Sequence, residues 1–257
     1  MSIAQASVTQ IPQGRNLVAI ASGKGGVGKT WLAITLSHAL ARAGGHPLLF
    51  DGDLGLANVD IQLGLQPERD LGAAMSGELP LRDTALPYEA GGFDVIAGRS
   101  GSGSLASLAP PRLASLSRAL LELAPAYDRV ILDLGAGIDE RVRGLATLCA
   151  SSLVVTSDEP TALTDAYAFI KLALKRDPDA DLRVVVNMAA SQAEGERTYA
   201  TLRKACTSFL KSDPPLAGII RRDPKAKDAI RSQEPLLTRY PNCDAAADVE
   251  RLAESLS

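Results

Sequence analysis

The sequence is short of two features that would assign the chain to a specialised class. Cysteine is scarce, and Cys149, Cys206 and Cys243 stand too far apart to form a local C-x-x-C pair. A zinc knuckle or a redox dithiol encoded by such a pair is therefore excluded. No stretch approaches the roughly 18 to 20 apolar residues that a membrane-spanning helix needs. The chain also lacks a basic start followed by an apolar run, so we expect a cytoplasmic protein.

An excess of charge of one sign is absent as well. Lys and Arg total 27 against 30 Asp and Glu, a formal net charge of -3. This balance creates no overall field that would attract a polyanion, although a local basic patch is compatible with it. Hydrophobic residues make up 46% of the 257 positions, which is enough for one substantial core. No linker or repeat interrupts the chain, so we expect one large domain.

Seven short apolar runs predict strands, and segments of helical period separate them. Apolar residues recur at steps of three and four in 32–43, 113–123 and 163–174, which predicts helices with one buried stripe. Strands without strict alternation, separated by helices, indicate an α/β fold with a mainly parallel sheet covered on both faces. The small-residue stretch 98–104 predicts a mobile loop or a crossover. The expected strands are 17–21, 47–50, 93–97, 129–134, 153–157, 183–187 and 216–220.

Residues 22–30, SGKGGVGKT, have the spacing of a phosphate-binding P-loop. Positions 23 and 28–30 match G-x-x-x-x-G-K-[ST], and the loop lies between a predicted strand and a predicted helix. We expect the loop's N–H groups to face the β-phosphate, Lys29 to neutralise β and γ oxygens, and the Thr30 hydroxyl to ligate Mg²⁺. The nucleotide-binding residues expected here are Gly23, Lys24, Gly25, Gly26, Val27, Gly28, Lys29 and Thr30.

Acidic residues follow two other predicted strands. Asp51 and Asp53 stand in LLFDGDLG just past one strand, and Asp133 ends another in VILDLGAG. In an open parallel sheet these strand ends meet at the crevice where ligands bind. Asp133 therefore has the position of a Walker B carboxylate, which holds Mg²⁺ through water. A lone aspartate there is often only a turn former or a helix cap, but three in one P-loop chain favour a magnesium–nucleotide site.

The loop KGGVGKT, with its early lysine, resembles the deviant Walker A loop of the MinD/ParA ATPases. In that family the extra lysine reaches across a face-to-face dimer to the nucleotide of the partner subunit. The resemblance therefore implies that Lys24 acts in trans, in the manner of an arginine finger. The sequence shows no evident partner for Lys24 in its own subunit, and a compact lysine charge suits a phosphate.

Four further segments are similar to the flagellar number and placement regulators FlhG and FleN. The likeness, over about residues 16–241, implies a single-domain P-loop ATPase that dimerises with ATP, hydrolyses it slowly and limits flagellar number or position. It implies as partners a second copy of the chain and the GTPase FlhF, flagellar switch-complex proteins or a flagellar transcription regulator. Transient recruitment to the cell pole or inner membrane is left open. The segments are DGDLGLANVDIQLGL (51–65), MSGELPLRD (75–83), SDEPTALTDAYAFIK (157–171) and VVVNMAASQAEGERTY (184–199).

The resemblance also assigns roles to single residues. It implies that Asp53 orients the attacking water, so that Lys24 and Asp53 are the catalytic residues, and that Asp51 supports the Mg²⁺ shell. Asn187 is expected to read the adenine edge, and Asp223 is placed among the nucleotide-binding residues. The modest basicity of an aspartate suits slow hydrolysis limited by positioning.

Three departures from the family pattern are visible. Arg221 stands in AGIIRRDP where the family usually has a proline near the adenine, which leaves the base contacts open. Leu134 follows Asp133 where the family commonly has a hydroxyl residue, which would weaken the grip on Mg²⁺ or water. Residues 1–15 contain no DQAxxLR-like segment of the kind that stimulates FlhF, so that activity is not assigned, and we expect a flexible extension.

Two segments bear on other partners. Residues 242–257 predict an acidic amphipathic helix, which an anionic membrane would repel, so packing on the domain is favoured. The basic segment 221–231 leaves open a ParA-like partition ATPase that holds DNA nonspecifically. A solvated helix face is favoured there, because no aromatic residue interleaves the charges. An iron–sulfur carrier lacks paired cysteines, and a P-loop kinase lacks an acceptor-binding domain, so both are weaker alternatives.

Overall fold

An eight-stranded sheet runs through the part of the chain that the computed structural model describes, which is 14–53, 56–98, 110–137 and 139–256. The strand order is β3-β4-β2-β5-β1-β6-β7-β8, and every neighbouring pair is parallel except the antiparallel β3–β4 pair. The strands are β1 (Gly14–Ser22), β2 (Pro47–Gly52), β3 (Leu86–Tyr88), β4 (Phe93–Ile96), β5 (Arg129–Ala136), β6 (Cys149–Thr156), β7 (Leu182–Ala189) and β8 (Leu216–Arg221).

The predicted α/β fold with a mainly parallel sheet is confirmed, with one strand more than expected. The additional strand, β3, has only three residues and pairs antiparallel at the edge of the sheet. It contains Pro87, which an edge strand tolerates because one side of its backbone has no partner strand. Nearly all of the predicted extension 1–15 and most of the predicted loop 98–104 lie outside the described residues.

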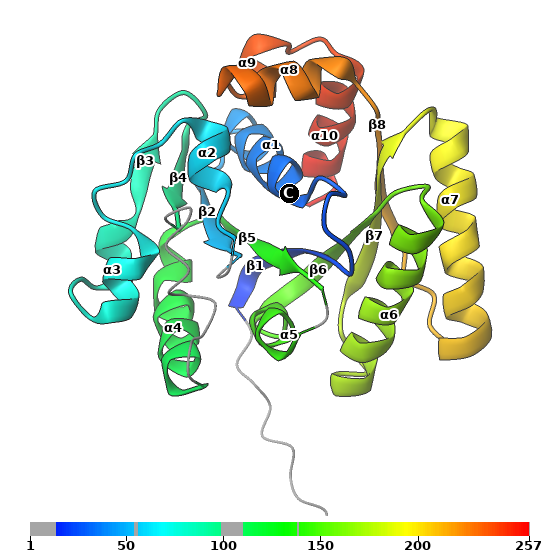
Figure 1. The fold of residues 1–257 in the computed structure, drawn as a ribbon, viewed down its shortest axis with the longest axis horizontal. Helices are drawn as coiled ribbons and strands as arrows, with labels where there is room; N and C mark the ends of the chain where they lie inside the picture. Colours follow the sequence, from blue (N-terminus) through cyan, green and yellow to red (C-terminus); the bar gives the residue numbers. More distant parts are fainter. Residues whose placement is uncertain (1–13, 54–55, 99–109, 138, 257) are drawn as a thin grey trace, which may run out of the picture.

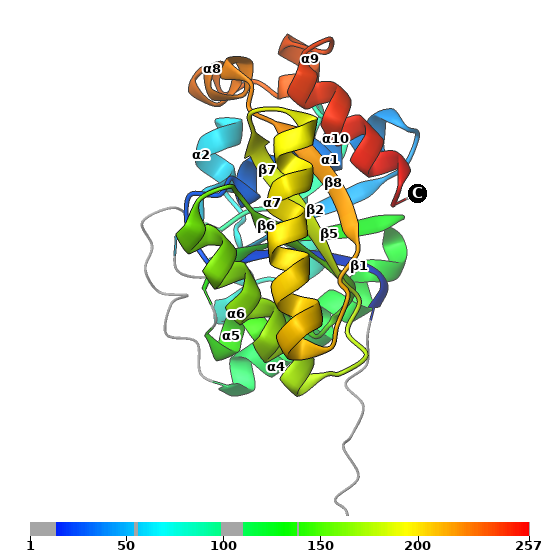
Figure 2. The ribbon, with the colours of Figure 1, turned by 90° about the vertical axis from the view of Figure 1, so that its right-hand side faces the viewer.

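Helices cover both faces of the sheet (Figure 1). Helices α1 and α10 lie on one face, α4, α5 and α6 lie on the other, and α7 packs on β7 and β8 (Figure 2). The helices are α1 (Lys29–Arg42), α2 (Val59–Leu63), α3 (Leu71–Ser76), α4 (Pro110–Leu123), α5 (Glu140–Ala146), α6 (Pro160–Arg176), α7 (Gln192–Ala205), α8 (Pro224–Ser232), α9 (Leu236–Arg239) and α10 (Asp244–Glu254).

The central strand β1 shows why its sequence is apolar without alternation. Val18 and Ile20 belong to the core cluster under α1 and α10, whereas Leu17, Ala19 and Ala21 belong to the cluster on the opposite face. All five are buried, because successive side chains of a strand point to opposite faces and helices cover both. The strand is therefore held rigidly from both sides, and its end at Ser22 is a firm base for the loop that follows.

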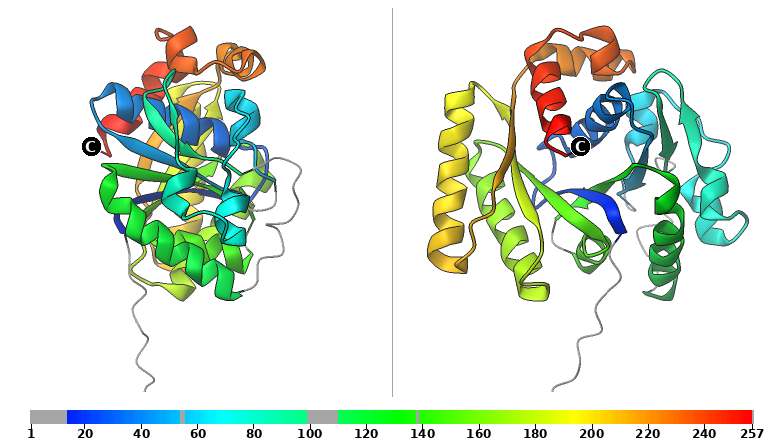
Figure 3. Two further views of the ribbon diagram at one scale, coloured as in Figure 1. Left: turned by 90° about the vertical axis from the view of Figure 1, so that its left-hand side faces the viewer. Right: turned by 180° about the vertical axis from the view of Figure 1, so that it is seen from behind.

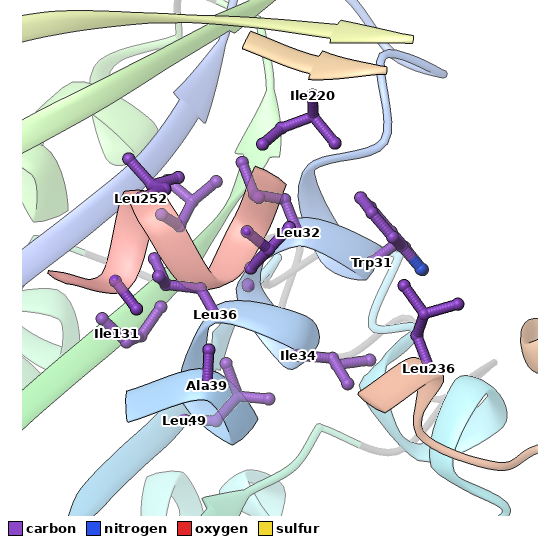
Figure 4. Close-up of a cluster of buried hydrophobic side chains, with 14 of the residues drawn as sticks. Trp31, Leu32, Ile34, Leu36, Ala39, Leu49, Ile131, Ile220, Leu236 and Leu252 are labelled. Atoms are coloured by element: carbon purple, nitrogen blue, oxygen red, sulfur yellow. The ribbon is translucent and has the colours of Figure 1, made fainter. Parts of the chain in front are cut away.

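The C-terminal helix α10 is part of the core. Leu252 of α10 packs in the same cluster as Leu32 and Leu36 of α1 and Ile220 of β8 (Figure 4). Figure 3 shows α10 beside α1 when the molecule is seen from behind. None of the described helices is both long and apolar enough to cross a membrane.

A buried ion network fastens α10 to β8. The carboxylate of Asp248 accepts hydrogen bonds from Arg221 Nε at 2.9 Å, from Gln192 Nε2 at 3.1 Å and from Arg251. Arg221 also pairs with Asp244, with 2.8 Å between Nη1 and Oδ1. The arginine that replaces the family's proline is therefore a structural link to α10. Because Asp244 and Asp248 neutralise its charge, Arg221 does not add to the basic surface of segment 221–231 that the DNA-binding alternative requires.

Candidate nucleotide-binding site

The glycine-rich loop lies between the end of β1 and the start of α1, in the order that the motif predicts. Gly26 and Gly28 have positive φ angles of 81° and 86°, a left-handed backbone that glycine adopts without strain. Lys29 is the first residue of α1, so the amides of the loop and the N-terminus of the helix lie together. This arrangement is a ready-made anion site.

Close packing explains two of the glycines. A Cβ atom on Gly23 would lie 2.1 Å from the backbone oxygen of Asp165 in α6. A Cβ atom on Gly28 would lie 2.4 Å from Nδ2 of Asn187, the residue near the end of β7. Neither side can give way easily, so these glycines are required for the loop to sit against α6 and β7, as well as for close approach of a phosphate.

Asn187 is buried, and its side chain holds the glycine-rich loop against β7 like a brace. Its Nδ2 donates to the Val27 oxygen at 2.8 Å, and its Oδ1 accepts from the Met188 N–H at 2.9 Å. Met188 has a φ of 57°, and the register of the β7–β8 pair shifts between Val186 and Ala189. Both ends of the amide are thus engaged within the protein, and a contact of Asn187 with adenine stays a prediction.

Asp223 caps a helix in the structure. Its Oδ1 accepts a hydrogen bond of 2.9 Å from the N–H of Lys225, the second residue of α8. This contact is the usual one for an aspartate at the N-terminus of a helix. The nucleotide contact expected for Asp223 stays a prediction.

Asp51 and Asp133 lie directly opposite each other on the neighbouring strands β2 and β5. Each is only 1% exposed. Burial, together with the charge of Asp133, raises the pKa of Asp51 to about 7. Burial likewise raises the pKa of Asp133 to about 7, although the Thr30 hydroxyl and the Lys29 ammonium oppose it. Two carboxylates at this spacing repel each other and favour a cation between them.

The residues at these strand ends fit Mg²⁺. Within the described chain, the buried Oδ1 atom of Asp133 has no hydrogen-bond partner, which leaves it available to a ligand. The same part of the chain contains no group of three His, Cys, Asp or Glu side chains that could enclose a metal. Mg²⁺ suits such a site, because it usually takes one or two carboxylates, several waters and phosphate oxygens.

Leu134 does not enter this site. It is 1% exposed and belongs to the core cluster on the face of α4, α5 and α6. Asp133, its neighbour in the strand, points to the other side. At the position where the family commonly has a hydroxyl residue, this chain therefore has a core side chain.

The segment after β2 is organised by Asp51. The N–H of Asp53 donates to Oδ1 of Asp51 at 3.2 Å, and the N–H of Val59, which opens α2, donates to its Oδ2 at 3.3 Å. Asp53 in turn accepts from the Leu56 N–H at 3.0 Å. A Cβ atom on Gly135 would lie 3.1 Å from Asp53 Oδ1, so the backbone after Asp133 passes close to Asp53.

The two lysines of the loop lie in different surroundings. Lys29 is 8% exposed, and burial lowers its pKa while the charges of Asp133 and Asp53 oppose this shift. Lys24 is 34% exposed at its side chain. Its Nζ donates to Glu159 Oε2 at 2.5 Å and to Thr161 Oγ1 at 2.8 Å.

The expectation that Lys24 has no partner in its own subunit is therefore wrong. Glu159 and Thr161 open α6, which follows β6, and β6 is the neighbour of β1 in the sheet. The start of α6 thus lies beside the glycine-rich loop although 135 residues separate Lys24 from Glu159. The pairing lowers the pKa of Glu159 and keeps that side chain charged.

The structure brings together the strand ends that the sequence predicts to converge, and it adds contacts from other segments. Lys29, Asp51, Asp53 and Asp133 lie at one edge of the sheet, as the parallel topology predicts. Glu159 and Thr161 lie in the family-like segment 157–171, and no motif in the sequence points to Gly135. The only available signal for Glu159 and Thr161 was the position of that block after a predicted strand.

The chain matches the family model described as the CobQ/CobB/MinD/ParA nucleotide binding domain over residues 18–236. It is 36% identical over 240 residues to the antiactivator FleN of Pseudomonas aeruginosa. The aligned region covers 93% of this chain and 85% of FleN. It is 30% identical over 239 residues to the flagellum site-determining protein YlxH of Helicobacter pylori, covering 92% of this chain and 80% of YlxH.

Solved structures with this fold are known. The cell division ATPase MinD of Pyrococcus furiosus has a TM-score of 0.79 to this chain at 25% identity and covers 95% of this chain and 98% of its own. The septum site-determining protein MinD of Pyrococcus horikoshii, solved with Mg-ADP, also has a TM-score of 0.79, at 23% identity. It covers 95% of this chain and 96% of its own.

Proposed function

Because the chain belongs to the CobQ/CobB/MinD/ParA nucleotide-binding family and is a Mg²⁺-dependent ATPase, we propose that it is an ATP-controlled dimerisation switch. We propose that the switch controls the number or placement of flagella. The names of its relatives support this role, since FleN is an antiactivator and YlxH is a flagellum site-determining protein. Slow hydrolysis of ATP sets how long the dimer lasts.

The contrast between Lys24 and Lys29 carries the proposal. Lys29 is buried beside Asp133 and Asp53, where it serves the phosphates of its own subunit. Lys24 lies at the exposed rim and is held by side chains rather than by the core. A solvent-exposed ion pair contributes little to stability, so exchanging Glu159 for another anion costs little. The triphosphate of a partner subunit, in a poorly hydrated interface, attracts Lys24 more strongly than an exposed carboxylate does.

Two exposed apolar residues that follow Asp53 in the chain support a partner surface. Leu56 is 74% exposed and Ile61 is 54% exposed, and both belong to the segment that begins at Asp53. Exposed large apolar side chains next to a polar site are typical of protein interfaces. A dimer that faces the two nucleotide sites toward each other would cover them.

Within each subunit the site orients water for attack. Thr30, Asp51 and Asp133 would hold the metal, and Mg²⁺–ATP would supply the reactive triphosphate when bound. Asp53 is partly exposed and accepts a hydrogen bond from a water that approaches the γ-phosphate. ADP lacks the γ-phosphate and offers Lys24 less charge, so dimerisation follows ATP, and the coupling between the two is reciprocal.

Light scattering with an ATP-locked background tests the switch. The Asp53→Ala variant is expected to form a dimer with Mg²⁺–ATP and to stay a monomer with Mg²⁺–ADP. Adding Lys24→Ala is expected to abolish the dimer while calorimetry still detects ATP binding. Lys171→Ala, which removes an exposed charge from α6 away from the loop, is the matched control and leaves the dimer intact. A Lys24→Ala protein that dimerises with ATP would exclude the trans-lysine mechanism.

The partner that we propose for the dimer is a flagellar protein. FlhF, switch-complex proteins and a flagellar transcription regulator are the candidates, and the description of FleN as an antiactivator favours the last. Pull-down from the cell's own extract with the Asp53→Ala protein and ATP identifies it, with ADP as the control. Recovery of the same proteins with ADP would contradict a nucleotide-controlled interaction.

A further inference from the structure

Two buried polar atoms without partners lie between the P-loop helix and the segment that carries Asp53. Trp31 directly follows Thr30 in α1 and is 8% exposed, and Figure 4 shows its indole nitrogen turned toward Leu236 of α9. Gln62 is in α2. Counting only contacts among the described residues, neither Nε1 of Trp31 nor Oε1 of Gln62 has a hydrogen-bond partner, although both atoms are buried.

The two atoms are complementary and line one small cavity. The indole nitrogen is only a donor and the amide oxygen is only an acceptor. The cavity lies between α1, α2, α8 and α9, has a volume of about 10 Å³, and is also lined by Thr35. This is close to the smallest volume that holds one water, and such a water needs two or more polar partners.

We propose that one water joins the Trp31 indole N–H to the Gln62 amide oxygen, and that this link positions α2 for ATP hydrolysis. Gln62 is then a positioning residue, since it lines a cavity with Trp31 and Thr35 of α1 and acts on hydrolysis only through α2. The proposal rests on the role proposed above for Asp53, because α2 matters for hydrolysis through the segment that it anchors.

The contacts of α2 show how its position reaches the site. At its start, the Val59 N–H donates to Asp51 Oδ2 at 3.3 Å, and Asp51 also accepts from the N–H of Asp53. At its end, Gln233 Nε2 donates to the Ile61 oxygen at 2.8 Å. A helix of five residues is not stable alone, so its place depends on such contacts.

The proposed link joins α2 to the helix that begins at the P-loop. Trp31 is adjacent in sequence to Thr30, the expected Mg²⁺ ligand, and Gln62 is within one turn of Val59. A shift of α2 away from α1 would therefore move Asp51 and Asp53 relative to Thr30. Because catalysis by positioning is sensitive to small displacements, loss of the link lowers the hydrolysis step more than nucleotide binding.

A double-mutant cycle tests the link. Gln62→Leu removes the amide at nearly constant size, and Trp31→Phe removes the N–H but keeps an aromatic ring. We expect each variant to lower single-turnover hydrolysis roughly 3- to 30-fold with ATP affinity changed less than about twofold, and the double variant to be no slower than the slower single variant. The control is Gln66→Leu, an exposed glutamine shortly after α2, which leaves the rate unchanged.

If the two substitutions caused independent packing defects, their effects on the hydrolysis rate would multiply in the double variant. If they break the same link, the double variant is no slower than the slower single variant. Trp31 is the only tryptophan, so its emission gives a second readout. We expect Mg²⁺–ATP to change this emission in the parent and to change it less in Gln62→Leu. Unchanged hydrolysis in both single variants, or multiplied effects in the double variant, would overturn the proposal. Asp53→Ala in the same assay tests the role of Asp53 separately. If that variant hydrolyses ATP at the parent rate, the role proposed for Asp53 is wrong, but the cycle still measures the coupling between Trp31 and Gln62.

Discussion

Two buried aspartates, Asp133 and Asp248, differ in what surrounds them. Asp133 is 1% exposed and Asp248 is 2% exposed. Asp248 accepts hydrogen bonds from Arg221, Gln192 and Arg251, so its charge is satisfied from within the chain. Asp133 has a raised pKa, and one of its oxygens has no partner among the described residues. A buried carboxylate that the protein satisfies belongs to the scaffold, whereas one that it leaves unsatisfied marks where a ligand brings charge.

The place of each aspartate in the fold explains the difference. Asp133 lies near the carboxyl end of β5, beside β1 and the glycine-rich loop. Asp248 lies within α10, above the end of β8, where two arginines can reach it. The first position is at the end of the sheet where ligands of parallel α/β folds bind, and the second is enclosed between a helix and an edge strand.

The largest effect is expected from removing the satisfied aspartate. Asp248→Ala leaves Arg221 without its main partner and is expected to lower the free energy of unfolding by about 3–5 kcal/mol. Urea unfolding measures the loss, and ATP affinity of the folded fraction stays near that of the parent. Asp244→Ala, which removes the exposed partner of Arg221, is the control and costs about 1 kcal/mol or less. Equal losses in the two variants would show that the buried carboxylate is not the anchor of α10.

The next largest effect is the loss of ATP affinity expected from removing Lys29, which lies near Asp133. Lys29→Ala is expected to weaken ATP binding by roughly 10²-fold or more, because charge-assisted bonds to the phosphates are lost in the monomer. Lys24→Ala is expected to change ATP affinity of the monomer only a few-fold, since its side chain is held by Glu159 at the rim. Calorimetry measures the ATP affinity of both variants. Similar losses for the two lysines would remove the distinction between a cis and a trans role.

Asp53 extends the comparison to an aspartate that is only partly buried. Asp53→Ala is expected to bind Mg²⁺–ATP and to slow hydrolysis by about 10²-fold, because water is no longer oriented. Single-turnover kinetics with calorimetry separates the two quantities. A rate near that of the parent would assign the positioning of water to another residue.

The local parts of this site were predictable from the sequence. The loop at Gly23–Thr30 and the aspartates at 51 and 133 follow from motif spacing and from the rule that parallel strand ends converge. The fold class followed from apolar runs and helical periods, while β3 escaped because three residues with a proline carry no periodic signal.

The contacts that join distant segments were not predictable in the same way. Lys24 meets Glu159 only because β6 lies next to β1, an order that apolar runs do not reveal. Asn187 braces Val27 across 160 residues, a contact that depends on the register of β7. Arg221 could be recognised as a departure from the family pattern, but its partner Asp248 appears only when α10 packs on β8.

The smallest effect, and the most direct test of the difference between Asp133 and Asp248, is the pH dependence of stability. The pKa of Asp133 is about 7 in the folded protein against 3.8 as a free side chain. Between about pH 4 and pH 7 the folded state therefore holds a proton that the unfolded state has released. The stability that this proton contributes is lost as pH rises through that range. One such group lowers the free energy of unfolding by about 1 kcal/mol between pH 6 and pH 8.

Urea unfolding at pH 6, 7 and 8 without nucleotide measures this slope. Asp133→Asn is expected to reduce it, because an amide does not titrate, while the buried Asp51 still contributes. Saturating Mg²⁺–ATP is expected to reverse it, since the metal prefers the ionised carboxylates and binds more tightly as pH rises. Asp248→Asn, in contrast, is expected to lower stability by a similar amount at every pH in this range, because it weakens the ion pairs with Arg221 and Arg251, and both arginines stay charged throughout. A parent slope that Asp133→Asn leaves unchanged would mean that other groups, and not the unsatisfied carboxylate, take up the proton.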